Sequence, residues 1–272
     1  MDANDDEARK IFDDYNCKGV PHLLFVDDKG NEVDRIIGYL PPSEYLARIQ
    51  DIRNNKYTLD DFLAQYEKED ADAEIIAGIA MKYEDRGDSE NAKEFYLILI
   101  KDYHDPTSEH YQRGTYFLAS DAFKNGVQMA LNTYILSFPD SPFIEEAFYT
   151  MAYHYADKEM KEDELKVYTQ MLADLPENTG VLNSYAWRMA EIELNLLDAL
   201  EKVQKAVVLS ANDPGSQANI IDTEAEVLWK LKRFDAAIDA IEKAIVIDGE
   251  NQYFKDQKEK FIQSKKGDVQ SV

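Results

Sequence analysis

Apolar residues recur with two different spacings along this chain, and the first part of it mixes both. A helix is predicted over residues 5–17, where apolar residues follow the three-to-four-residue spacing of one helix face. Leu23–Asp27 has the length of a buried strand, and Glu32–Tyr39 alternates well enough to form a second one. Between them, Asp28–Asn31 has turn chemistry, because Gly30 tolerates a positive φ. We expect a β-hairpin.

Two further helices are predicted before residue 73. Pro42 suits the first turn of a helix whose apolar stripe includes Tyr45, Leu46 and Ile49. Residues 53–72 are polar, but a second helix is expected there with Thr58 as its N-cap. Its apolar face would consist of Tyr57, Leu59, Phe62, Leu63 and Tyr66. The acidic run Glu67–Glu74 shows no fixed ligand spacing, so we interpret it as solvated helix ends rather than a metal site.

From residue 73 onward the pattern repeats. Proline-containing turns at Pro106, Pro142, Pro176 and Pro214 lie about 34 to 38 residues apart, and two amphipathic helices fit between consecutive turns. This spacing predicts five helical pairs, over residues 73–106, 111–142, 144–177, 181–213 and 219–250. A final helix over about 252–265, rich in lysine, would cap the array and precede a flexible tail.

Small residues mark the points at which the two helices of each pair would cross. Ala92, Ala130, Ala199 and Ala237 occupy this place, because only a small side chain allows close helix contact. The third pair departs from the pattern, since its equivalent position falls near Glu164. Tyr96, Tyr134 and Tyr168 follow one turn later and would wedge between neighbouring pairs.

Both parts of the chain resemble known families. The repeats resemble tetratricopeptide (TPR) repeats, and residues 5–52 resemble the second half of a thioredoxin-like domain. In that resemblance Val20–Pro21 is the cis bond, Gly30 the hairpin turn and Gly38 the glycine late in the last strand. The expected fold is mainly α: a TPR-like α-solenoid of helical hairpins preceded by a small α/β partial thioredoxin-like fold. The expected domains are residues 1–52, a bridging helix over 53–72, repeats over 73–251 and a cap with its tail over 252–272.

The thioredoxin-like resemblance does not bring the family's chemistry with it. The reactive Cys-x-x-Cys belongs to the first half of that fold, which this sequence lacks, and Cys17 has no second thiol nearby. We interpret Cys17 as apolar filler, with an oxidation-sensitive thiol as the alternative. The cis-proline loop of Val20, Pro21 and His22 would contact a substrate only beside the missing half. His22, where threonine is usual, is expected to be a surface histidine.

Composition narrows the classes of partner. The net charge is −24, which disfavours nucleic acids and anionic membrane surfaces. The acidity is explained by solubility, or alternatively by attraction of a basic partner. No apolar run is long enough to span a bilayer, and no nucleotide-binding or hydrolase motif, metal-ligand spacing or cofactor motif occurs. We therefore expect no catalytic residue, metal or cofactor in this chain alone. Fusions of this kind are bacterial and often exported, which favours the cell envelope over the alternative, the cytoplasm.

The concave face of the repeats is the main candidate for function. TPR proteins bind peptides or protein segments there, mostly through the first helix of each pair. The mapping places Gly78, Met81 and Asp85, then Tyr185, Arg188 and Ile192, then Thr223, Glu226 and Lys230 on this face. TPR proteins that bind the acidic tails of chaperones are expected to have asparagine where this chain has Arg188 and Glu226. Binding of chaperone tails is therefore disfavoured. Trp187 and Trp229 are interpreted as repeat core, with peptide anchoring as the alternative.

Two functional hypotheses follow. The first is a protein-interaction module, a TPR-like scaffold carrying a redox-inactive thioredoxin-like remnant. The second is a truncated form of a thioredoxin-like thiol-disulfide oxidoreductase, or of a redox-linked chaperone, with a TPR tail. A half sheet also leaves a strand edge unpaired. We expect the helix within 53–72, or a second copy of the chain in a homodimer, to cover that edge.

Overall fold

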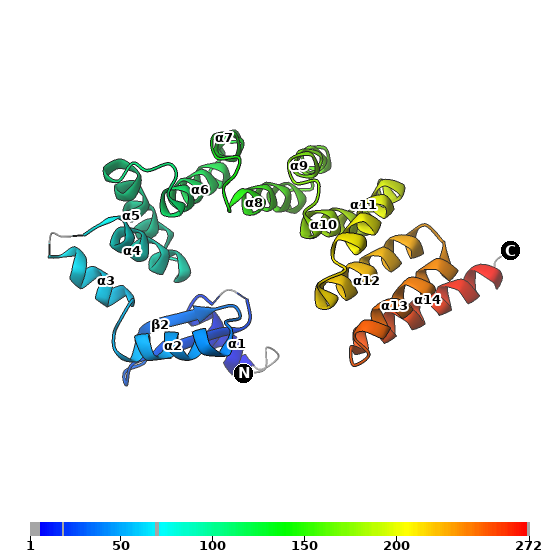
Figure 1. Ribbon diagram of the computed structural model, residues 1–272, viewed down its shortest axis with the longest axis horizontal. Helices are drawn as coiled ribbons and strands as arrows, with labels where there is room; N and C mark the ends of the chain where they lie inside the picture. Colours follow the sequence, from blue (N-terminus) through cyan, green and yellow to red (C-terminus); the bar gives the residue numbers. More distant parts are fainter. Residues whose placement is uncertain (1–5, 18, 69–70, 271–272) are drawn as a thin grey trace. The chain divides into compact units, whose positions relative to one another are not determined.

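A helix, a β-hairpin and a second helix come first along the chain in this computed structural model, which describes residues 6–17, 19–68 and 71–270 (Figure 1). These elements are α1 (Asp6–Asp14), β1 (His22–Val26), β2 (Glu32–Ile37) and α2 (Pro42–Arg53). Contacts divide the chain into two compact units, residues 1–147 and 148–272. The predicted helix–strand–strand–helix order is confirmed.

The hairpin pairs β1 and β2 in antiparallel register, with Leu23 opposite Ile36 and Phe25 opposite Asp34. Its turn forms because the Asp27 carboxylate accepts hydrogen bonds from backbone N–H groups two and four residues later, at 2.8 Å each. Gly30 adopts a φ of 84°, in the left-handed region that favours glycine, as the sequence predicted. These local interactions specify the hairpin.

The helix predicted within residues 53–72 is α3 (Leu59–Tyr66). Thr58 caps it, because its hydroxyl accepts a hydrogen bond from the Asp61 backbone N–H at 3.2 Å. This cap confirms the expectation for Thr58. Within the acidic run at 67–74, residues 69 and 70 lie outside the described residues.

The first unit continues with two helical pairs, α4 (Ala73–Asp85) with α5 (Ser89–Asp102) and α6 (Glu109–Lys124) with α7 (Ala130–Ser137). Helix α4 packs against α5 and also beside α6, so the first helices of successive pairs are neighbours. Asp72 and Asp88 cap α4 and α5, because each carboxylate accepts a hydrogen bond from the backbone N–H of the third residue of its helix.

The second unit has the same organisation. Its helices are α9 (Lys161–Asp174), α10 (Thr179–Glu191), α11 (Leu196–Leu209), α12 (Pro214–Lys230), α13 (Phe234–Ile247) and α14 (Gln252–Gln270). The boundary between the units falls within α8 (Ile144–Asp157). Helix α10 packs against α11 and α12, α12 against α13, and α13 against α14. Helix α14 runs to residue 270, beyond the expected end near 265, and residues 271–272 lie outside the described residues.

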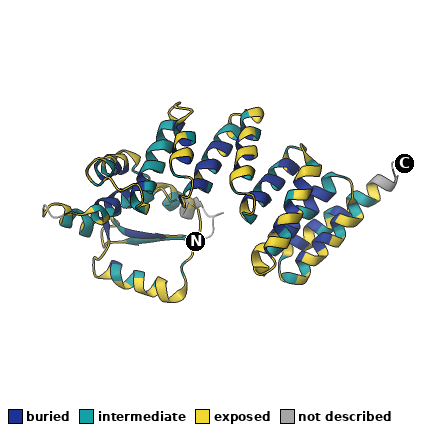
Figure 2. Ribbon diagram, turned by 45° about the horizontal axis from the view of Figure 1, so that its top comes forward, coloured by how far each residue is buried: buried dark blue, intermediate teal, exposed yellow. Residues whose placement is uncertain are grey.

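Buried faces alternate with exposed ones along these helices (Figure 2). Ala92, Ala199 and Ala237 are fully buried, as expected for residues at close helix crossings. Ala130 departs from this prediction: it begins α7 and is half-buried, while Leu131 beside it is fully buried. The fold class predicted from the sequence, a solenoid of helical hairpins after a small α/β segment, is confirmed.

Candidate binding surfaces

The cis-proline loop precedes β1 and ends near the last residue of β2. The Val20–Pro21 peptide bond is cis, and the Gly38 backbone N–H donates to the Pro21 carbonyl oxygen at 2.9 Å. Val20 is 83% exposed and Tyr39 77% exposed, so apolar surface lies open around this loop. His22 differs from the expectation of a surface histidine, because its ring is half-buried and meets the Phe12 ring edge-on.

Cys17 follows α1 and is half-buried. Burial raises the pKa of its thiol above the ordinary value, although the Arg35 guanidinium partly opposes this shift. A raised pKa leaves less thiolate at neutral pH, and the thiolate is the reactive form. The environment of Cys17 therefore fits a packing residue better than a nucleophile.

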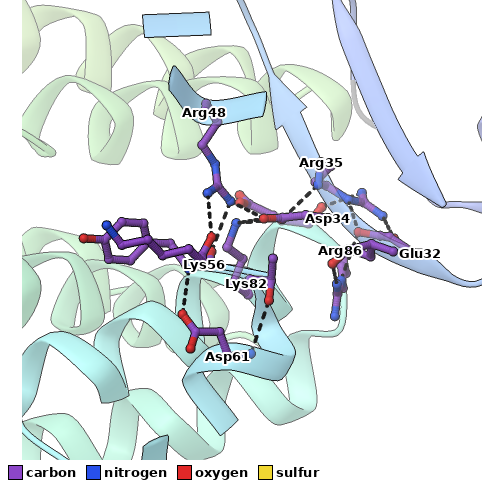
Figure 3. Close-up of polar contacts among 12 residues, drawn as sticks. Glu32, Asp34, Arg35, Arg48, Lys56, Asp61, Lys82 and Arg86 are labelled. Carbon is purple, nitrogen blue, oxygen red and sulfur yellow. Dashed lines mark hydrogen bonds and ion pairs between the residues drawn. The ribbon is translucent and has the colours of Figure 1, made fainter. Parts of the chain in front are cut away.

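Charged side chains on β2 join the hairpin to the first repeat helix, a contact that sequence reasoning missed (Figure 3). Asp34 is fully buried, and both its carboxylate oxygens accept from Lys82 Nζ on α4, at 2.7 and 2.9 Å. Arg48 on α2 donates to the same carboxylate. Burial lowers the pKa of Lys82, and the Asp34 carboxylate only partly compensates. One buried anion thus holds cations from two helices.

A second group of charges lies beside it. Arg35 donates from Nε to Glu32 at 2.9 Å, and from its Nη1 to the Asp85 backbone oxygen at 2.8 Å. Arg86 donates to the same Glu32 carboxylate at 2.9 Å. Burial alone would raise the pKa of Glu32, but hydrogen bonds and attraction from both guanidinium groups lower it. We name Glu32, Asp34, Arg35, Arg48, Lys82 and Arg86 the junction cluster. The only signal of it in the sequence was a pair of opposite charges, Asp34 and Arg35, inside a short strand.

The residues predicted to line a groove in the first unit are partly covered by the chain itself. Gly78 allows the Phe62 ring of α3 to approach α4, since a Cβ there would lie 2.6 Å from Cζ of that ring. Met81 and Asp85 are half-buried, and burial raises the pKa of Asp85. Gly78 therefore meets α3, the Asp85 backbone oxygen meets Arg35 of the hairpin, and Met81 packs against the core between α4 and α5.

In the second unit the polar groove candidates pair within the chain. Arg188 donates to both carboxylate oxygens of Glu164, at 2.6 and 3.1 Å. Lys260 of α14 donates to Glu226 at 2.6 Å, and Lys230 to Glu193 at 2.9 Å. Glu164 is buried where the small residue was expected, so Arg188 supplies the charge that makes this departure tolerable.

Three predicted groove residues are removed from any open surface. Tyr185, Thr223 and Glu226 are 5%, 3% and 8% exposed, and the Tyr185 hydroxyl donates to Asp198 at 2.6 Å. Ile192 caps α10 at its C-terminus and is half-buried. The mapped residues lie on or at the end of α4, α10 and α12, but a side chain that faces a neighbouring helix is buried by it.

The second unit also carries a tyrosine pair on α8 that the mapping missed. Tyr149 and Tyr153 of α8 stack with ring centroids 5.7 Å apart, and Tyr153 is 59% exposed. The Tyr149 hydroxyl hydrogen-bonds Ser184 at 2.9 Å, one turn before Arg188 on α10. This contact places the pair beside the face of α10 that carries Ser184 and Arg188. Its signal was two tyrosines four residues apart on the first helix of a pair.

Trp229 takes a packing position between α12 and α14. Its ring lies 6.1 Å from that of Phe261, and its Nε1 donates to the Ser264 hydroxyl at 2.9 Å. A pocket of about 320 Å³ occurs in the first unit, with His104 and Tyr111 among its lining residues. Across the described residues, no three His, Cys, Asp or Glu side chains gather as metal ligands would. Nor does any described helix have the length and apolar character needed to cross a membrane.

Comparison with known proteins agrees with the first part of the chain. The family model of the thioredoxin-like domain matches residues 2–53. No curated protein matches. Among solved structures, the chain is similar to one in the crystal structure of the APC/C hetero-tetramer Cut9-Hcn1, with 14% identity and a TM-score of 0.46. The match covers 79% of this chain and 40% of that one, so this chain spans well under half of that neighbour's length. The thioredoxin-like start predicted from the cis-proline and hairpin pattern is confirmed.

Proposed function

We propose that this chain is a protein-interaction scaffold whose helical pairs bind a peptide or protein segment. The observation that carries this proposal is the side-by-side packing of first helices, α4 with α6 and α10 with α12, which would give each unit one inner face built from successive first helices. Ion pairs such as Arg188 with Glu164 hold that face in place, so binding would need little rearrangement.

The partner-contacting surface is centred on the tyrosine pair of the second unit. Tyr153 offers a large exposed ring, and tyrosine is a residue that interfaces favour. Arg188 on α10, Ile192 at its end and Lys230 on α12 are half-buried, and they would supply polar and apolar contacts. Tyr185, Thr223 and Glu226 leave the contact set because other helices bury them.

Site-specific photocrosslinking tests this proposal. A photoreactive phenylalanine analogue replaces Tyr153 on the inner face or, as a matched control, Val246, which is 85% exposed on the second helix of its pair. Irradiation in lysate from the source organism should attach a polypeptide at position 153 and none at 246. Equal labelling of both positions, or no labelling at 153, would contradict the scaffold assignment.

A second candidate function is thiol-disulfide exchange by a longer protein that carries this chain. It is favoured by the cis Val20–Pro21 bond and by the family match over residues 2–53. The raised pKa of Cys17 argues against exchange by this chain alone. An insulin-reduction assay on the chain should be negative, and a Cys-x-x-Cys encoded about 40 residues upstream would support the longer enzyme.

Self-association is the third element of the proposal. Helix α3 packs against β2, and Lys82 of α4 donates a hydrogen bond to Asp34 of β2. Within the described residues, the only strand that pairs with β1 is β2. The helix expected within residues 53–72 therefore packs against β2, one of the two strands that could have been left open. A homodimer would cover the other.

A further inference from the structure

The pocket of about 320 Å³ in the first unit lies where α5 ends and where α4 and α6 begin. Its volume is at the small end of the range for ligand sites. Its lining includes Ala73 at the start of α4, Leu99 and Tyr103 at the end of α5, Asp105 in the following loop, and Ser108 and Tyr111 at the start of α6. Leu99 and Tyr111 are 1% and 9% exposed, whereas Asp105 is exposed. The pocket therefore combines a largely apolar floor with an acidic rim.

Two hydroxyl groups of this lining have no hydrogen-bond partner within the described residues. The ring of Tyr111 packs against the rings of His104 and Phe138, with centroids 5.1 and 6.2 Å away, but no described group bonds its hydroxyl. Ser108 is the N-cap of α6, yet its hydroxyl makes no capping hydrogen bond. Buried polar groups are nearly always paired, so the hydroxyl of the buried Tyr111 is placed to serve a ligand.

Asp105 sets the sign of the charge that the pocket attracts. Thr107 donates to its Oδ1 from the backbone N–H at 3.0 Å and from the hydroxyl at 2.7 Å. These hydrogen bonds lower the pKa of Asp105, so the carboxylate is ionised at neutral pH. Lys101 pairs with Asp102 at 3.9 Å. The chain neighbours of the lining residues include no lysine or arginine but several exposed carboxylates: Asp72, Glu74, Asp102 and Glu109.

The helix ends at the pocket do not reverse this sign. A helix N-terminus carries about half a positive charge and a C-terminus about half a negative charge. Ser108 begins α6 and Tyr103 ends α5, so their partial charges oppose each other in the pocket. The N-terminus of α4 is already capped by the Asp72 carboxylate. The full negative charge of Asp105 therefore decides the balance, and the pocket favours a cation.

We propose that the pocket receives a lysine side chain of a partner polypeptide. The methylene groups lie on Leu99 and Tyr111 and the ammonium group lies at the rim beside Asp105, because lysine buries its stem while its charge stays near water. The three N–H groups of the ammonium match Asp105 Oδ2 and the hydroxyl oxygens of Ser108 and Tyr111. Arginine fits less well, since its planar fork prefers both oxygens of a carboxylate and Thr107 already occupies Oδ1.

Fragment titration by NMR tests the sign of the charge. The chain has four histidines, so the imidazole Hε1 signal of His104, a lining residue, can be followed in a one-dimensional spectrum and assigned by its loss in His104→Asn. The n-butylammonium ion, which is the lysine side chain without its backbone, should shift this signal saturably, and butyrate at equal ionic strength should not. Saturable binding of butyrate, or of neither fragment, would overturn the pocket assignment.

Two substitutions test the assigned groups. Asp105→Asn keeps the Oδ1 acceptor for Thr107 but removes the charge, and should weaken n-butylammonium binding about tenfold. Asp28→Asn removes the same charge from the exposed hairpin turn and should leave binding unchanged. Tyr111→Phe removes a hydroxyl that bonds no described group, so it should weaken binding without shifting the urea midpoint. Equal weakening by Asp105→Asn and Asp28→Asn would reveal unspecific attraction to an acidic chain and overturn the site.

Nα-acetyl-lysine methylamide distinguishes a polypeptide lysine from a free amine, because it carries the flanking peptide groups. It should bind as tightly as n-butylammonium, and binding of n-butylammonium alone would overturn the lysine assignment. The choice of a polypeptide partner rests on the proposed scaffold function, whereas the preference for a cation does not. Since the fragments bind or fail whatever is crosslinked at Tyr153, failure of this inference is distinguishable from failure of the scaffold proposal.

Discussion

At the scale of single residues, the junction cluster is held by a carboxylate that water does not reach. Asp34 is 0% exposed and compensates Lys82 and Arg48, which come from different helices. Removing charges from water is costly, and the pairs offset that cost only while every partner is present. The stability of the junction therefore depends on every buried charge keeping its partner, more than on the number of ion pairs.

Asp34→Ala should be strongly destabilising, because it leaves the Lys82 ammonium partly buried without its anion. We expect a loss of about 3–5 kcal/mol in the free energy of unfolding of the first unit, measured by urea titration. Asp28→Ala removes the same charge from the exposed hairpin turn and should change that free energy by less than about 0.5 kcal/mol. Equal effects would show that the junction cluster contributes little.

Asp222 is a carboxylate of the second unit whose charge is buried with incomplete compensation. It is 5% exposed on α12, and one of its carboxylate oxygens has no hydrogen-bond partner within the described residues. Burial first, and then repulsion from Glu226, raise its pKa to about 6, while Tyr253 and Lys260 of α14 oppose the shift. Folding thus favours the protonated acid.

Because the pKa of Asp222 is raised in the folded chain, the free energy of unfolding should depend on pH. The contribution of Asp222 to stability is complete below the unfolded pKa of about 4 and is lost as pH rises through about 6. Asp222→Asn should therefore stabilise the chain at pH 8 by about 1–3 kcal/mol and have little effect at pH 4. Thermal unfolding of both proteins from pH 4 to 8 measures the difference. The exposed Asp239→Asn is the control, and a pH-independent difference for Asp222→Asn would contradict the assignment.

At the scale of elements, a glycine at the contact determines how closely α3 approaches α4. Gly78 leaves room for the Phe62 ring, and Phe62 belongs to the apolar face that the sequence pattern had assigned to α3. The contact links the bridging helix to the first repeat. A glycine inside a helix costs stability by itself, so its presence here has a packing reason.

Gly78→Ala should destabilise the first unit by about 1–3 kcal/mol, because the added methyl group cannot coexist with the ring in its present position. Gly267→Ala is the matched control: this helical glycine on α14 has nothing within 4 Å of an added Cβ. It should stabilise by up to about 1 kcal/mol through helix propensity alone. Denaturant midpoints distinguish the two, and stabilisation by both substitutions would exclude a tight α3–α4 contact.

Local chemistry explains which elements the sequence could predict. The Thr58 cap and the Gly30 turn depend on interactions within a few residues, and Ala92 recurs at a fixed place in the repeat, so their signals are readable in the sequence. The contacts between β2 and α4 in the junction cluster and the Glu164–Arg188 pair join residues 24 to 54 positions apart, and no periodicity in the sequence indicates such partners. The same limit displaced Tyr185 and Glu226 from the predicted groove, because burial by the next helix depends on tertiary packing.

At the scale of the whole molecule, each helical pair contacts mainly its neighbours in the chain, as the packing of α10 and α11 against α12 illustrates. In such arrays stability is roughly a sum of local terms, so damage at one place should not spread evenly. The chain forms two compact units, and the junction cluster lies wholly within the first.

Hydrogen exchange in Asp34→Ala should reveal this locality. We expect faster amide exchange in α2, α3 and α4, which pack around the junction, and unchanged exchange in α10 to α13 of the second unit. Exchange is measured by mass spectrometry of peptides from both units, in Asp34→Ala and in the control Asp28→Ala. The comparison separates the loss of a buried charge from the loss of an exposed one. Uniform acceleration through α13 would mean that the chain unfolds as one cooperative body. In that case a partner bound at Tyr153 would also stabilise the hairpin, since ligand binding protects whatever unfolds together with its site.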